Sequence, residues 1–301
     1  MKKLLLFSLS SVLLLGACGQ MTNDDKDNQH NTTTEQAKND HHKENHESDG
    51  HNHQNHNHED HDIEVTVDTV VDKEDDHYIV AHGDHYHEVP ISNVSKDDRQ
   101  KIDENLKAHP NLKKEHEKKQ EIQAGNFEDA EVSDRELSDW EGDWQSVYPY
   151  LEDGTLDPVM EMKALESDGK KDADEYKDYY ETGYKTDVKS IKIHGDEITF
   201  IKNDGSEVMG KYKADGYEVL HYEAGNKGVR QKFTKVGGDD EAYQSVQFSD
   251  HNIGPTDDVM HFHLYFSNDS HDELLKGIDN WPTYYPQSWN GDQILEDQLH
   301  H

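Results

Sequence analysis

Apolar residues are spread unevenly along the chain and divide it into segments of different character. An apolar stretch from Leu4 to Leu15 comes first, and residues 19–62 then contain almost no apolar residue. A segment so polar cannot bury enough surface to offset the entropy lost on ordering, so we expect it to be disordered. Of the 26 aromatic residues, 22 lie at or after Trp140, which places the packed domain at residues 137–301.

The packed domain is predicted to be mainly β. Alternating and β-rich runs recur at roughly ten-residue spacing, which is typical of an antiparallel sandwich or a small barrel. Glycine-containing turn signals separate the runs, and Ala214-Asp215-Gly216 is one of them. Strands are expected at residues 188–201, 207–212, 217–222, 229–236, 243–248 and 260–266. Short helices are expected at residues 158–164, 271–279 and 292–299.

Two smaller parts are predicted between the polar segment and the β domain. In residues 63–93, short strands are expected at 64–67 and 78–81, around a turn that contains histidine. Residues 94–136 favour helix, with Ser95 as the N-cap and Pro110 dividing the helix into two pieces. The helical faces are mostly charged, so we expect a solvated spacer.

The first residues have the layout of an export signal, with basic residues, an apolar stretch too short for a comfortable membrane span, and small residues at the end of segment 1–17. The sequence Leu15-Gly16-Ala17-Cys18 resembles a bacterial lipobox, which implies that Cys18 carries lipid and begins the mature protein. Acylation would anchor the chain to the outer, extracytoplasmic face of the bacterial cell membrane through a polar tether, residues 18–62. The alternative is a free or buried cysteine near an ordinary signal peptide.

The charge excludes some partners and favours others. With 66 acidic against 30 basic residues, the formal net charge is −36, which disfavours binding to nucleic acid or to anionic lipid headgroups. The chain also carries 23 histidines, nine of them between His30 and His61. Neutral imidazoles bind metal without first losing a proton, so this part of the tether is suited to weak capture of divalent transition metals. The alternative is a solvated polar tail.

A second histidine group, His82, His85 and His87, follows an H-x-x-H-x-H spacing. A turn at residues 83–84 would let the three imidazoles converge on Zn²⁺. A fourth, oxygen ligand is expected from Asp72, Asp75 or Asp76. Residues 67–90 resemble one repeat of the streptococcal histidine-triad proteins, which implies a zinc site; the alternative is a chance cluster in a histidine-rich chain.

A third group lies in the β domain. His261 and His263 project to the same face of an extended strand, while the apolar residues between and beyond them face the opposite way. Two such imidazoles form half of a zinc site, and His251 from the preceding loop would complete it. The alternative is a pair of polar strand residues that face solvent.

Residues from about Leu137 onward are similar to the ZinT (YodA) family. The resemblance rests on the stretches at 144–151, 156–159, 178–180, 183–184 and 228–230, on Phe248-Ser249-Asp250-His251 and His261-Phe262-His263, and on the specific run at 279–286. It implies a calycin, lipocalin-like β-barrel with added helices and a metal held by His251, His261 and His263. The family also occurs joined to the solute-binding domain of zinc ABC transporters, which implies Zn²⁺ uptake with such a lipoprotein and its permease as partners.

Carrier and enzyme remain the competing functional classes. A three-histidine zinc with an open position superficially suits a hydrolase or lyase, but no H-E-x-x-H, G-x-S-x-G or P-loop motif is present. A third hypothesis, from the triad segment, is a surface adhesin or immune-interacting protein. We expect a non-enzymatic zinc scavenger, with Cd²⁺, Ni²⁺ or Cu²⁺ as substitutes because affinity alone discriminates poorly among these metals.

Overall fold

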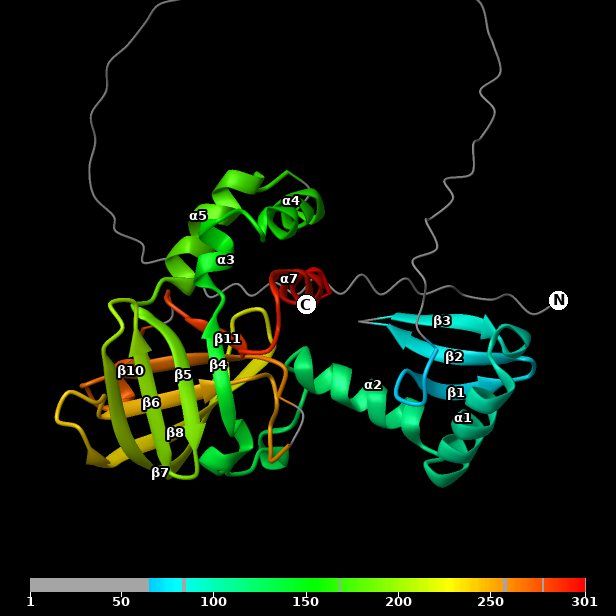
Figure 1. Ribbon diagram of the computed structural model, residues 1–301, viewed down its shortest axis with the longest axis horizontal. Helices are drawn as coiled ribbons and strands as arrows, with labels where there is room; N and C mark the ends of the chain where they lie inside the picture. Colours follow the sequence, from blue (N-terminus) through cyan, green and yellow to red (C-terminus); the bar gives the residue numbers. More distant parts are fainter. Residues whose placement is uncertain (1–64, 83–84, 168, 257–258, 278, 301) are drawn as a thin grey trace, which may run out of the picture. The chain divides into compact units, whose positions relative to one another are not determined.

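The computed structural model describes residues 65–82, 85–167, 169–256, 259–277 and 279–300 (Figure 1). Within these ranges the chain forms a three-stranded sheet, a closed β-barrel and several short helices. The predicted signal segment 1–17 and tether 18–62 lie outside the described residues. In the ranges that are described, no helix combines the length and the apolarity needed to cross a membrane.

The three-stranded sheet is antiparallel and has the order β1-β2-β3. Its strands are β1 (Val70–Glu74), β2 (His77–His82) and β3 (His85–Pro90). The strand predicted at residues 64–67 is wrong in position. Instead, the Thr66 and Thr69 side chains bond to each other's backbone N–H groups and close a turn just before β1.

The helical segment is divided into two helices, as predicted. Helix α1 (Lys96–Ala108) starts at Ser95, whose hydroxyl accepts a hydrogen bond from the Asp98 backbone. Helix α2 (Leu112–Gln123) begins after Pro110, which lacks the N–H that an unbroken helix needs. In α1, Ile102 is buried, and α2 buries no residue.

The barrel confirms the mainly β, lipocalin-like prediction and decides between sandwich and barrel. Eight antiparallel strands close in the order β10-β11-β4-β5-β6-β7-β8-β9. They are β4 (Gly142–Ser146), β5 (Val188–His194), β6 (Glu197–Lys202), β7 (Glu207–His221), β8 (Lys227–Gly238), β9 (Ser245–Ser249), β10 (Phe262–Ser267) and β11 (Thr283–Pro286).

The barrel interior is filled by large side chains from alternating strand positions. Trp140 is fully buried, stacks on Phe248 with ring centroids 4.5 Å apart, and meets Phe233 edge-on. Phe262 and Leu264 of β10 point into the same core, whereas His263 between them does not. Because successive side chains of a strand alternate between faces, filling the interior fixes which residues of β10 face outward.

The turn predicted at Ala214-Asp215-Gly216 is a bulge inside β7. The pairing of β7 with β8 shifts register between Ala214 and Tyr217, and Gly216 has a φ of 74°. Glycine adopts positive φ without a steric penalty, so the strand bends here and continues as one element.

A layer of helices rich in tyrosine packs near β11. Apolar and aromatic residues from four helices form one buried cluster with Tyr285 of β11. These helices are α3 (Tyr148–Glu152), α4 (Asp157–Glu166), α5 (Ala173–Tyr184) and α7 (Gly291–Leu299). The remaining helices are α6 (His271–Leu274) and the 3-10 turns η1 (Ile91–Asn93), η2 (Asp129–Glu131) and η3 (Leu137–Trp140).

Candidate metal centre

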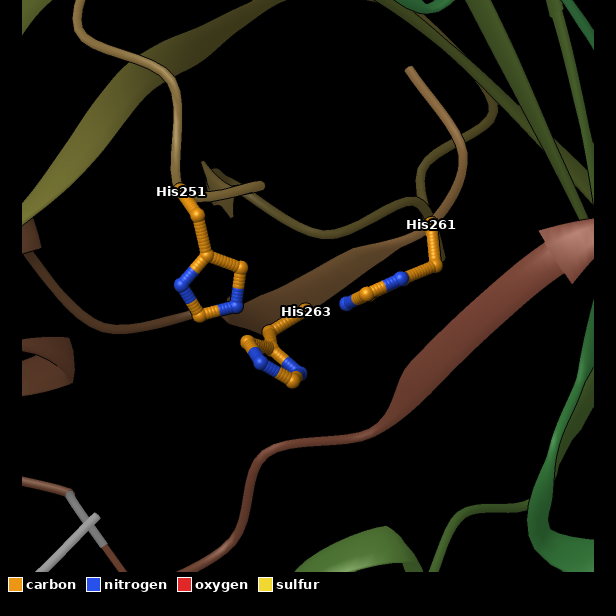
Figure 2. Close-up of side chains that lie close together, drawn as sticks. All are labelled: His251, His261 and His263. Carbon is orange, nitrogen blue, oxygen red and sulfur yellow. The ribbon is translucent and has the colours of Figure 1, made fainter. Parts of the chain in front are cut away.

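Three histidines of the barrel domain converge on one point. Figure 2 shows the rings of His251, His261 and His263 directed toward one another. Their ring centroids lie 5.4–5.9 Å apart, and one nitrogen from each ring lies within 4.8 Å of the other two. Among the described residues, these three histidines form the one group of His, Cys, Asp or Glu side chains whose ligand atoms lie close enough together to hold a metal ion.

The positions of His261 and His263 follow from strand alternation. Phe262 and Leu264 are fully buried in the barrel core, so the residues on either side of Phe262 project outward together. The β10 register pairs His263 with Ser249 of β9 and with Thr283 of β11. The core therefore sets the orientation of this half of the site.

The third histidine depends on an unusual backbone conformation just after β9. His251 has a φ of 62°, in the left-handed region that side chains other than glycine seldom adopt. The preceding Asp250 is held by two hydrogen bonds from Arg135, at 2.7 and 2.8 Å, and by one from the Trp140 indole at 3.1 Å. Its carboxylate also accepts the Asn252 backbone N–H. These contacts fix the turn that directs His251 toward the other two rings.

The Asp250–Arg135 pair is buried and reinforced. The side chains of Arg135 and Asp250 are 0% and 2% exposed, and the guanidinium also bonds Asp139 and stacks 3.9 Å from the Trp140 ring. A buried ion pair is favourable only when its hydrogen bonds are well satisfied. Here, it ties the segment just before η3 to Asp250, the residue that follows β9 and precedes His251.

The electrostatics of the site favour neutral imidazoles. Burial lowers the pKa of His251 to about 3, helped by repulsion from His261, while Asp297 opposes the shift. Burial likewise puts the pKa of His263 well below its ordinary value, and His251, His261 and Arg230 add to the effect. Neutral imidazole is the metal-binding form of histidine, so the rings of His251 and His263 are held in the protonation state that a metal needs.

Two of the rings are supported from behind. His263 Nδ1 lies 2.8 Å from the Thr283 hydroxyl, which in turn donates to the Trp281 carbonyl. His261 Nδ1 lies 3.2 Å from Asp297 Oδ2 on helix α7. Burial alone would raise the pKa of Asp297, but the nearby His261 ring and the hydrogen bond from Tyr285 outweigh it and lower the pKa.

The donor set suits zinc. Zn²⁺ accepts three imidazole nitrogens at about 2.0–2.1 Å in a tetrahedral site and leaves the fourth position open to water or another ligand. In such a tetrahedron the nitrogens are ~3.4 Å apart, so small side-chain rotations would close the present group around an ion. Three neutral imidazoles in a partly buried site are chemically adequate for this metal.

The second predicted group lies on the small sheet. The register pairs His82 with His85 and Val80 with His87, which places the three histidines at positions on one face near the end of the β2–β3 hairpin. Residues 83–84 and the side chains of His82 and His85 lie outside what the structure describes. For His87 the structure describes a partly buried side chain.

Two of the three oxygen ligands predicted for the triad, Asp75 and Asp76, need correction, and Asp72 stays a prediction. Asp75 and Asp76 belong to the turn between β1 and β2, at the opposite end of β2 from His82. Five strand steps separate His77 from His82, about 16 Å at ordinary strand rise. Neither Asp75 nor Asp76 can therefore bind the same ion as His82, because the whole length of β2 separates them from it.

The other candidate residues are dispersed. His194 contacts Glu141 on the surface, His221 pairs with Asp129, and His271 packs against Gln247 and Thr234. His300 follows helix α7 and belongs to no metal group of the described residues. The lipobox Cys18 lies outside the described residues.

Sequence reasoning missed the supporting residues Arg135, Asp250, Thr283 and Asp297. Each comes from a segment distant in sequence from the histidine that it supports, apart from Asp250, which precedes His251. The Ser-Asp-His stretch was one available signal, since an acidic residue beside a ligand in a turn often fixes that turn. No local pattern marks Arg135 or Asp297, because their roles arise only when the barrel closes.

Comparison with known proteins agrees with this geometry. The chain is 51% identical over 185 residues to the probable metal-binding protein YrpE of Bacillus subtilis, covering 62% of this chain and 72% of that one. It is 50% identical over 175 residues to the zinc-binding protein AdcA of Streptococcus pyogenes, covering 58% of this chain and 34% of AdcA. The match to AdcA thus spans about a third of that longer protein.

A solved structure shows the same fold. The Zn(II)-bound ZinT-like domain of Streptococcus pneumoniae AdcA superposes with a TM-score of 0.56 at 46% identity, covering 59% of this chain and 97% of that domain. The model of the family described as ZinT (YodA) periplasmic lipocalin-like zinc-recruitment matches residues 118–301, more than half of the chain. The barrel, its helices and the converging histidines therefore identify this chain as a member of the ZinT (YodA) zinc-recruitment family.

Proposed function

We propose that this protein captures Zn²⁺ outside the cytoplasm at His251, His261 and His263 and passes it to the solute-binding lipoprotein and permease of a zinc ABC transporter. The observation that carries the proposal is the convergence of three imidazole nitrogens within 4.8 Å. Relatives named for zinc binding, and a related domain solved with Zn(II) bound, support the choice of metal.

The zinc is proposed to be cargo, and the protein a carrier. A carrier needs a site that holds the ion firmly yet can give it up by ligand exchange, and three protein ligands with an open fourth position meet both needs. The relatives are named for metal binding, which supports a non-enzymatic role. Cd²⁺, Ni²⁺ and Cu²⁺ are expected to compete for the same imidazoles.

The parts before the barrel are proposed to feed this site. Lipid on Cys18 would hold the chain at the outer face of the cell membrane, and the nine tether histidines would collect zinc weakly. His82, His85 and His87 would hold it with intermediate affinity, and the barrel site most tightly. The acidic composition supports cation capture by the chain, because carboxylates raise the local concentration of divalent cations.

The test is a zinc titration in competition with a chelator of known affinity, so that only the tight site is read. We expect one tightly bound Zn²⁺ per chain, and we expect H263A to weaken it by more than the 10–100-fold typical of losing a supporting residue. The matched control is H221Q, because His221 is a mostly exposed histidine outside the group. If H263A bound zinc as tightly as the wild type, the assigned site would be wrong.

A further inference from the structure

Helix α7 brings a carboxylate to the back of one proposed ligand. Asp297 Oδ2 lies 3.2 Å from His261 Nδ1, and the Asp297 side chain is only 14% exposed. The helix is fixed at its start by a capping box between Asn290 and Gln293 and is anchored in the core by Ile294. The position of this carboxylate is therefore set by packing.

Asp297 ends a chain of buried hydrogen bonds whose direction can be deduced. An ionised carboxylate only accepts, so the Tyr285 hydroxyl, 2.7 Å away, donates its single proton to Asp297 Oδ2. The Tyr285 oxygen must then accept the bond from Gln298 Nε2 at 2.6 Å. This leaves Gln298 Oε1 to accept from Tyr184 of helix α5, at 2.9 Å. Every donor in the chain points toward Asp297.

The direction of these hydrogen bonds decides which nitrogen of His261 carries the proton. Because Asp297 has no proton to give, the contact with His261 is attractive only when Nδ1 carries the hydrogen. The lone pair is then on Nε2, which is left for the metal. The Nδ1–H is not aimed straight at the oxygen in this structure, although the two atoms are 3.2 Å apart.

We propose that Asp297 is a positioning residue that holds His261 in the Nδ1–H form and thereby presents Nε2 to the zinc ion. The inference rests on the proposed zinc site and adds to it a residue that does not itself contact the metal. Carboxylates behind metal-binding histidines fix the ring orientation and raise the basicity of the ligand. Helix α7 thus completes the site although it supplies no ligand.

The ring of His263 is oriented in the same way, but its partner, the Thr283 hydroxyl, is neutral. The Thr283 hydroxyl donates its proton to the Trp281 carbonyl, so toward His263 it can only accept. His263 therefore also carries its hydrogen on Nδ1 and offers Nε2. The two rings differ in one respect, because only His261 has a negative charge behind it.

The first test reads the proton directly in the metal-free protein. Nitrogen-15 NMR of the imidazoles at pH 7.5 should show His261 in the Nδ1–H form in the wild type. In D297L, which has no acceptor, that form should lose its dominance, and in D297N, which retains an oxygen, it should persist. The matched control is E296Q, since Glu296 is exposed and adjacent on the same helix. A dominant Nε2–H form in the wild type would overturn the proposal.

The second test is zinc affinity with the same variants. D297L is expected to bind zinc about 10–100-fold more weakly, D297N less so, and E296Q like the wild type. If D297L fails to fold, Y285F replaces it, because it removes the hydroxyl that orients Asp297, and a several-fold loss is expected. Unchanged affinity in D297L, or in Y285F where it stands in, would refute the positioning role.

The outcomes also separate this inference from the function on which it rests. If H261A abolishes tight binding while D297L does not change it, the zinc site stands and the role of Asp297 fails. If H261A has no effect on binding, the proposed site itself fails. The NMR result remains interpretable in either case because it needs no metal.

Discussion

At the scale of single residues, the metal centre combines one local rule with several distant contacts. The outward direction of His261 and His263 could be predicted from alternation along a strand, because Phe262 and Leu264 must enter the core. No such rule predicts how His251 approaches them. Its φ of 62° is held through Asp250 by Arg135, which lies more than a hundred residues earlier.

The pH dependence of the apo protein follows from these buried rings. The pKa of His251 falls from its ordinary value to about 3 on folding, and that of His263 also falls well below its ordinary value. Below about pH 6.5 the unfolded chain binds protons that the folded chain excludes. The stability contribution is therefore complete above that pH and is lost as the pH falls toward 3, at up to about 1.4 kcal/mol per pH unit for each ring.

Urea unfolding of zinc-free protein between pH 7.5 and 5 measures this effect. We expect stability to fall with pH in the wild type and to fall less steeply in H263L, which removes one buried imidazole. H221Q, at an exposed histidine, should follow the wild type. An identical slope in H263L would mean that the His263 ring takes up protons in the folded state. The low pKa values also move proton-driven zinc release to lower pH than an ordinary imidazole would give.

The ion pair beneath His251 gives a second prediction at this scale. Replacing Arg135 by methionine leaves Asp250 buried without its counter-charge, and we expect a loss of about 3–5 kcal/mol in the free energy of unfolding. The control is K276M, which breaks an exposed pair with Glu273 and should cost less than about 1 kcal/mol. Urea denaturation compares the two, and equal costs would contradict the structural role of Arg135.

At the scale of elements, the strands were more predictable than the helices. Alternation predicts most barrel strands within a few residues. The sequence around Gly216 predicts a turn where the structure has a bulge, because both need a residue with positive φ. Helix α5 was missed because its tyrosines pack against Trp281, which lies about a hundred residues later. That contact depends on the closed barrel, which brings Trp281 next to the helix.

Gly183 of α5 lies directly against the Trp281 ring. A Cβ built on it would lie 2.3 Å from the Trp281 ring, so G183A should force the helix and the indole apart. Alanine favours helix over glycine by about 1 kcal/mol, but overpacking costs about 1–3 kcal/mol and is expected to prevail. Thermal unfolding tests this against G237A, where the added Cβ meets Lys211 at an ordinary 3.7 Å. A stabilised G183A would show that Trp281 yields freely.

At the scale of the whole molecule, composition and resemblance together predicted a mainly β barrel with a three-histidine site. Strand spacing alone left sandwich and barrel open, because both are built from the same alternating strands. Closure depends on β11 pairing with β4, whose partners Tyr284 and Ser146 lie far apart in sequence. The ligands could be predicted because they are close in sequence, and their supports could not because they come from the segment before η3, from β11 and from α7.

The last prediction concerns which histidines bind zinc weakly and which bind it tightly. Nine histidines lie between His30 and His61, and we expect them to bind zinc weakly at several points. Deleting residues 19–62 should remove the weak sites in a zinc titration and leave the tight site unchanged, because the barrel ligands come from β10 and from the loop between β9 and β10. A full-length variant with those nine histidines changed to glutamine keeps the carboxylates and separates imidazole binding from acidic attraction. If that variant retained all the weak sites, the carboxylates would be the collectors and the histidine tether would have no part in capture.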